Sequence, residues 1–90
     1  MPNLRVPALM KFYIEGQTEV LLHGLTVSDA ISDLVTRYPA IKPHIMDNNG
    51  DLRRYINLFV NDTNIKDLNG LKTPIQDNDR IILLPSISGG

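Results

Sequence analysis

The residues best suited to chemistry lie at the end of this chain, where Gly89 and Gly90 are the last two residues. Glycine has no side chain and adopts almost any backbone conformation, so two terminal glycines can enter a narrow channel in another protein. Extended, residues 85–90 span about 20 Å, enough to reach a buried active site. We therefore expect a flexible tail that can carry its terminal carboxylate, on Gly90, into the active site of a partner. That tail comprises Ser86, Ile87, Ser88, Gly89 and Gly90.

The other side chains that could do chemistry form no recognisable site. The chain has no cysteine, which excludes disulfides, thiolate metal sites and cysteine nucleophiles. His23 and His44 lie far apart in the sequence, and neither has an acidic neighbour at the spacing of a metal site or a catalytic triad. The acidic loop 47–51 lacks the glutamate that closes a calcium-binding loop. We expect no metal ligands, no bound cofactor and no catalytic residues, so the chain is predicted not to be an enzyme.

The composition is that of a single globular domain. The chain has 90 residues, of which 42% are hydrophobic and 21% charged. A net charge of −1 gives no electrostatic reason to expect a nucleic acid or an anionic membrane as partner. The sequence shows neither a signal-peptide pattern nor a run of about 18 apolar residues. We expect a cytoplasmic protein.

The elements that must position the tail begin with a predicted hairpin. The apolar stretch 4–14, a turn around Gly16 and the stretch 18–22 indicate two paired strands. A helix follows, with Ser28 as its predicted N-cap and Thr26 as the competing residue. Pro39 is expected to end this helix. Its apolar side recurs at helical spacing in Val27, Ala30, Ile31, Leu34, Val35 and Tyr38.

The second half of the chain contains two further clear strands. A short helical turn is expected at 41–46 and a loop at 47–51. Alternating apolar residues predict a strand over 55–61, and a brief strand is predicted at 65–68. The last strand, 80–85, is apolar on both faces, which is typical of a central strand or of a strand that binds a partner.

This order of elements predicts a β-grasp (ubiquitin-like) roll of the α+β class. A right-handed crossover places the last strand beside the first, with one main helix across a mixed sheet of four to five strands. We expect residues 1–85 to form the β-grasp domain and residues 86–90 to form the tail. On the sheet face opposite the helix, strand alternation would expose Phe59, Ile82 and Leu84. An apolar patch of this kind is typical of a protein-docking surface.

Three stretches are distinctive in combination: Asn57–Asp62, Asp77–Ile81 and Leu83–Gly90. Together they resemble the ThiS/MoaD family of ubiquitin-like sulfur carrier proteins over nearly the whole chain. The resemblance is strongest to the CysO-type carriers of cysteine biosynthesis, which have a similar end to the helix at Tyr38 and Pro39. MoaD-type carriers more often have an aromatic residue before the proline, where this chain has Leu84.

The resemblance implies a defined chemistry for Gly90. A partner adenylyltransferase of the ubiquitin-activating type uses ATP to convert the carboxylate into an acyl adenylate. A sulfur source then displaces AMP and leaves a thiocarboxylate, which donates sulfur to a downstream acceptor enzyme. A cysteine synthase-like acceptor is expected, with thiamine or molybdopterin synthesis as the other routes. Partner enzymes are expected to dock on the patch formed by Phe59, Ile82 and Leu84.

Two other functions remain open at this point. A ubiquitin-like modifier would be joined through Gly90 to lysines of other proteins, and it needs the same tail and the same adenylation. A plain interaction domain would carry an idle tail. Mass distinguishes a sulfur carrier from a modifier, because a thiocarboxylate adds about 16 Da whereas conjugation yields products of high mass.

Overall fold

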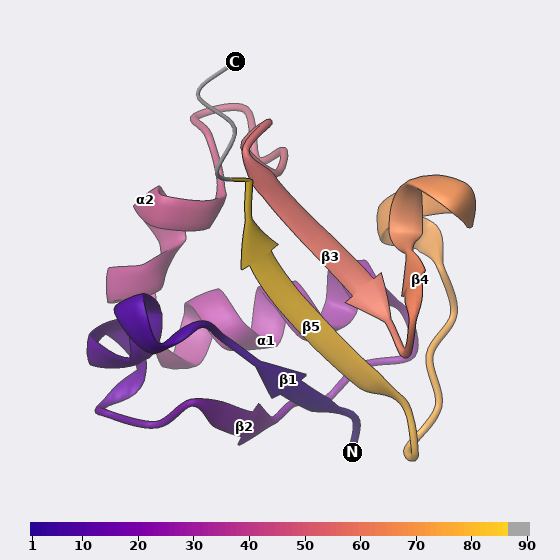
Figure 1. The fold of residues 1–90 in the computed structure, drawn as a ribbon, viewed down its shortest axis with the longest axis horizontal. Coiled ribbons are helices and arrows are strands. Elements are labelled where there is room, and N and C mark those ends of the chain that lie inside the picture. Colours follow the sequence, from indigo (N-terminus) through magenta and orange to yellow (C-terminus); the bar gives the residue numbers. More distant parts are fainter. Residues whose placement is uncertain (87–90) are drawn as a thin grey trace.

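The computed structural model describes residues 1–86, which form a mixed five-stranded sheet with helices on one face (Figure 1). The strands lie in the spatial order β2-β1-β5-β3-β4. Their bounds are Asn3–Arg5 (β1), Glu19–Leu21 (β2), Ile56–Val60 (β3), Thr63–Asn64 (β4) and Arg80–Pro85 (β5). The α-helices are Val27–Arg37 (α1) and Lys42–Ile45 (α2), and the 3-10 helices are Ala8–Ile14 (η1), Pro39–Ile41 (η2), Ile65–Asp67 (η3) and Gly70–Lys72 (η4).

The pairing of the strands confirms the predicted β-grasp topology. β1 pairs antiparallel with β2 and parallel with β5, so the last strand lies beside the first as expected. β5 also pairs antiparallel with β3 along the whole length of β3, which makes β5 the central strand. Its core face is apolar and buried through Ile81 and Leu83, whereas Ile82 and Leu84 lie on the opposite face.

The core lies between the sheet and α1, which crosses one face of it (Figure 1). Alternate strand residues point into this layer, because successive side chains of a strand face opposite sides. The fully or almost fully buried side chains from the strands are Leu4, Val20, Ile56, Leu58, Val60, Ile81 and Leu83. Those from α1 are Val27, Ala30, Ile31 and Leu34, four of the six residues on the predicted apolar side. The other two, Val35 and Tyr38, are half-buried and pack against the core.

The helix α1 ends before Pro39 as predicted, but it starts earlier than Ser28 as N-cap would place it. The Thr26 hydroxyl accepts a hydrogen bond from the Asp29 N–H at 3.2 Å, and Thr26 has the extended backbone of a capping residue. Ser28 already lies inside the helix, so its prediction as N-cap was wrong. The tertiary contact Val27 N–H to Thr73 carbonyl, at 2.9 Å, fixes where the first turn starts. A sequence window cannot show that contact, because the two residues are far apart in the chain.

The stretch 4–14 is not one strand, which corrects the sequence prediction. β1 ends at Arg5, and η1 occupies Ala8–Ile14. Pro7 has no N–H to continue the ladder, so the strand cannot extend through it. Met10 and Ile14 are buried, four residues apart, on the inner side of η1. The burial of these two side chains favours the helical conformation over a longer strand.

The predicted brief strand at 65–68 was also wrong. The strand β4 is only Thr63–Asn64, and η3 follows it directly. The side chain of Asn64 accepts a hydrogen bond from the Lys66 N–H at 2.9 Å, which caps the 3-10 turn. Such local capping by asparagine competes with strand pairing and ends the strand here.

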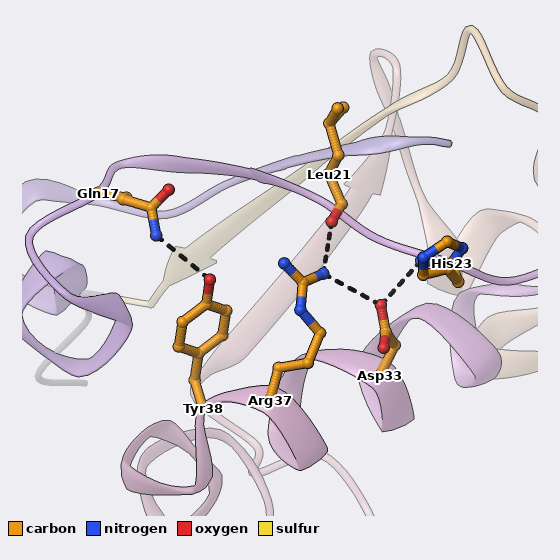
Figure 2. A network of polar contacts seen from close by, with 6 residues as sticks. All are labelled: Gln17, Leu21, His23, Asp33, Arg37 and Tyr38. Atoms are coloured by element: carbon orange, nitrogen blue, oxygen red, sulfur yellow. Dashed lines mark hydrogen bonds and ion pairs between the residues drawn. The ribbon is translucent and has the colours of Figure 1, made fainter.

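A polar network attaches α1 to β2 (Figure 2). One oxygen of the Asp33 carboxylate accepts the backbone N–H of His23 at 2.9 Å and the Arg37 guanidinium at 3.3 Å. Arg37 also donates to the Leu21 carbonyl at 2.7 Å. The His23 N–H, and to a lesser extent Arg37, lower the pKa of Asp33 from its ordinary value of 3.8, although partial burial opposes this shift. The network therefore holds the helix against the edge strand most strongly when Asp33 is ionised.

Candidate functional site

The central strand β5 leads to the predicted tail. Its last residue, Pro85, lies opposite Ile56 at the start of β3, next to the loop between α2 and β3 (Figure 1). Ser86 is exposed and is the last described residue. The predicted reactive group of Gly90, and the tail residues Ile87, Ser88 and Gly89, lie outside the described residues.

One backbone hydrogen bond holds Ser86. Its N–H donates to the carbonyl of Tyr55, which extends the β3–β5 ladder by one residue. Just before Tyr55, the Arg53 carbonyl accepts the Ile56 N–H at 3.0 Å, and the Arg53 N–H donates to the Ile45 carbonyl at 2.9 Å. Sheet pairing thus reaches at least Ser86, one residue past the predicted boundary at residue 85. The assignment of residues 87–90 to the tail stays a prediction.

The predicted patch residues share one face of the sheet. Phe59 lies directly opposite Ile82, and Leu84 lies opposite Asn57 in the same ladder. Leu84 is 45% exposed, and Phe59 and Ile82 are half-buried. The strand alternation on which the prediction rested is thus confirmed, since the intervening residues of both strands are buried in the core. Their role in docking stays a prediction.

Polar residues border this patch on both sides. In the row of paired residues that crosses the sheet, Arg5 of β1 lies beside Ile82, and Asn64 of β4 lies beside Phe59. Arg5 is exposed and Asn64 is half-buried. An apolar centre with a polar border is the usual composition of a protein–protein contact surface.

Sequence reasoning missed a cluster close to Ser86. The Tyr13 ring stacks on His44 with centroids 4.0 Å apart and an interplanar angle of 19°. The Tyr55 hydroxyl lies 3.5 Å from the His44 carbonyl, and the Tyr55 carbonyl accepts the Ser86 N–H. η1, α2 and the residue before β3 are therefore in contact, and Tyr55 connects them to Ser86. No local spacing signals this cluster, because its members come from three separate elements.

Within residues 1–86 no group of three or more histidine, aspartate or glutamate side chains is placed to hold a metal ion. His23 is exposed, and its hydrogen bond to Asp33 uses its backbone N–H. In the same part of the chain no helix is long and apolar enough to cross a membrane.

Comparison with known proteins identifies the family. Residues 6–90 match the ThiS family. The chain belongs to this family. The match spans almost the entire length of the chain and includes both β5 and the terminal glycines. Membership of the family predicted from the three sequence stretches is therefore confirmed.

Individual relatives agree with this assignment. The sulfur carrier protein CysO of Mycobacterium tuberculosis is 36% identical over 90 residues, which cover 98% of this chain and 97% of that protein. CysO in the crystal structure of the Amycolatopsis orientalis BexX/CysO complex is similar over 100% of both chains, with 29% identity and a TM-score of 0.89. The small archaeal modifier protein 1 of Methanosarcina acetivorans has 33% identity and a TM-score of 0.87, covering 98% of this chain and 94% of its own. These matches confirm the ubiquitin-like β-grasp fold.

Proposed function

We propose that this protein is a sulfur carrier of the CysO type, with the Gly90 carboxylate as the carrying group. The similarity to CysO over nearly the full length of both chains is the observation that carries the proposal. The terminal Gly89–Gly90 pair follows shortly after the central strand, where such a carrier needs it. In this role the protein is a substrate of partner enzymes and supplies no catalytic residue.

The proposed reaction has two steps on Gly90. A carboxylate oxygen attacks the α-phosphorus of ATP, and pyrophosphate leaves with formation of an acyl adenylate. The sulfur of a sulfide then attacks the acyl carbon, the bond from carbon to the AMP oxygen breaks, and AMP leaves with its electron pair. The product is a thiocarboxylate. Both steps take place in the active site of an adenylyltransferase of the ubiquitin-activating type, which binds the ATP.

The structure supports delivery of Gly90 into such an active site. The described sheet reaches Ser86, and the four residues that follow in the sequence would span about 13 Å if extended. The patch of Phe59, Ile82 and Leu84 lies on β3 and β5, the strands that meet at the base of the tail. We propose that the activating enzyme docks on this patch and receives the tail. The structure of a related CysO in complex with BexX supports a partner enzyme of some kind.

We propose a cysteine synthase-like enzyme as the acceptor of the sulfur, in the cytoplasm. This choice rests on the CysO-type resemblance. Thiamine or molybdopterin synthesis would use the same thiocarboxylate and the same tail.

A second function, protein modification, is favoured by a specific observation. The archaeal modifier protein is similar over almost the whole chain at a TM-score of 0.87. Conjugation would use the same adenylate, but a lysine amine would displace AMP and form an isopeptide bond through Gly90. The two functions therefore differ only in the nucleophile that attacks the activated carboxylate.

Intact-mass spectrometry tests the proposal. The protein is incubated with ATP, sulfide and the adenylyltransferase from its own genome, and a gain of about 16 Da is expected. A variant with one residue appended after Gly90 should gain nothing, and Ser28→Ala, which leaves the tail intact, should behave as the parent. Formation of the thiocarboxylate on the extended variant would refute the assignment to Gly90. Conjugates of high mass, without the 16 Da product, would establish the modifier function instead.

A further inference from the structure

A groove of about 330 Å³ lies on the β4 side of the sheet, outside the site described above. It is bounded by β3, the loop before β3, and the 3-10 helices η3 and η4. Its apolar lining consists of Leu52, Ile56, Leu58, Ile65 and Leu71. Ile56, Leu58 and Ile65 belong to the core, while Leu52 and Leu71 are partly exposed. The groove therefore has a firm apolar floor with accessible apolar walls.

The rim of the groove is positively charged. Arg53, Arg54 and Lys66 line it together with a single carboxylate, Asp51. This local excess of cations contrasts with the net charge of −1 of the whole chain. A rim of this composition attracts an anionic partner, and the attraction should weaken as salt screens it.

Two of the three cationic side chains on the rim are available to bind a partner. The Arg53 Nε donates to the Pro43 carbonyl at 2.7 Å, which holds that side chain against α2. The side chains of Arg54 and Lys66 form no hydrogen bond or ion pair with any residue in 1–86. Both residues are exposed and come from different walls of the groove. They can therefore bind carboxylates on either side of a group that fills the groove.

The open rim favours a peptide over a small molecule. Pockets for small molecules usually enclose most of the ligand surface. Here Asp51, Arg54 and Lys66 are exposed, so a ligand confined to the groove would remain partly in solvent. A peptide places one large apolar side chain in the groove and continues across the rim, where its acidic residues meet Arg54 and Lys66. The apolar lining favours an apolar anchor, and the cationic rim favours acidic residues beside it.

We propose that this groove binds a short acidic peptide segment of a partner protein, with a leucine-like side chain as the anchor. The groove is distinct from the patch of Phe59, Ile82 and Leu84, which faces the opposite side of the sheet. The two surfaces adjoin at Asn57, which lines the groove and lies opposite Leu84. The proposal is independent of sulfur transfer, because binding in the groove involves neither Gly90 nor ATP.

The proposal can be tested by titrating the full-length protein with a synthetic peptide and monitoring its amide chemical shifts by NMR. The probe is a blocked hexapeptide with two central leucines flanked by aspartate and glutamate. Saturable shifts centred on Leu52, Ile56, Lys66 and Leu71 are expected, and affinity should fall with added salt. Peptides with asparagine and glutamine for the acids, or serine for the leucines, should bind at least about tenfold more weakly. These peptide comparisons need no protein variant and so do not depend on the folding of one.

Protein variants give the matching comparison. The double substitution Arg54→Glu with Lys66→Glu should weaken binding of the parent peptide at least about tenfold. Arg5→Glu with Arg80→Glu makes the same change in net charge at exposed positions outside the groove, and it should bind as the parent does. Equal losses in both double variants would overturn the proposal, as would equal binding of the uncharged peptide. Shifts centred on Phe59 and Ile82, or equally tight binding of free 4-methylpentanoate, would also overturn it.

Discussion

The backbone N–H of Ser86 donates a hydrogen bond to the Tyr55 carbonyl, and this bond is the last connection between the sheet and the predicted tail in the described chain. It places the start of the tail at the N-terminal end of β3. The tail base is therefore tied to the same strand that contributes Phe59 to the outer patch. A partner docked on that patch would find the tail at a fixed starting point.

Ser86→Pro should loosen this starting point, because proline has no N–H to donate. Loss of one such hydrogen bond is worth about 1 kcal/mol, which corresponds to a fall in Tm of about 4–8 °C for a domain of this size. Ser86→Ala keeps the N–H and is the matched control. Differential scanning calorimetry compares the two variants. Equal melting temperatures would show that the bond contributes nothing to stability.

Leu84→Glu should impair activation without unfolding the protein. Leu84 is 45% exposed, so the charge meets solvent in the free protein but would be buried at a docked interface. We expect kcat/KM for adenylate formation to fall at least about tenfold, chiefly through KM. Leu25→Glu is the control, since Leu25 is 79% exposed and lies before α1, away from the outer face. Similar kinetics for both variants would argue against docking on the outer patch.

Asp33→Asn should lower stability in a pH-dependent way. The pKa of Asp33 is lowered in the folded state, chiefly by the His23 N–H, so its contribution is present above the ordinary value of 3.8 and is lost as pH falls through the folded pKa. Urea unfolding at neutral pH should show a deficit of about 1 kcal/mol for the variant. The deficit should shrink as the pH falls below 3.8. A deficit that stays constant across this range would mean that the effect is steric and not due to charge.

Thr26→Ala should weaken the start of α1, because the Thr26 hydroxyl accepts the Asp29 N–H. Loss of such an N-cap costs about 1 kcal/mol. Ser28→Ala, inside the first turn, should change stability by less than about 0.5 kcal/mol. Chemical denaturation of the two variants measures the difference. A larger loss for Ser28→Ala would contradict the observed cap and restore the cap predicted from sequence.

The sequence by itself determined the architecture and the family. The helical spacing of Val27, Ala30, Ile31 and Leu34 and the alternation in β3 and β5 are periodic signals, and each element buries the face that its own period predicts. The order of the elements then left few topologies, because crossovers between parallel strands have a preferred hand. The outer position of Phe59, Ile82 and Leu84 followed from the same alternation.

Only the tertiary structure decided how the apolar stretch 4–14 divides. Burial of Met10 and Ile14 against the core outweighed the strand pattern once Pro7 had interrupted the ladder. Likewise, contact with Thr73 fixed the first turn of α1 and made Thr26 its cap. Local propensity was too weak in these segments to resist packing with residues distant in the chain.

The surroundings of the tail and the groove also depended on the fold. Tyr13, His44 and Tyr55 meet because η1, α2 and the residue before β3 come together, and the groove exists because η3 and η4 pack beside β3. No spacing in the sequence encodes either arrangement, since their members are brought together only when the sheet closes over its core. The sequence could therefore predict Gly90 as the reactive end, whereas the described structure showed that the sheet extends at least as far as Ser86.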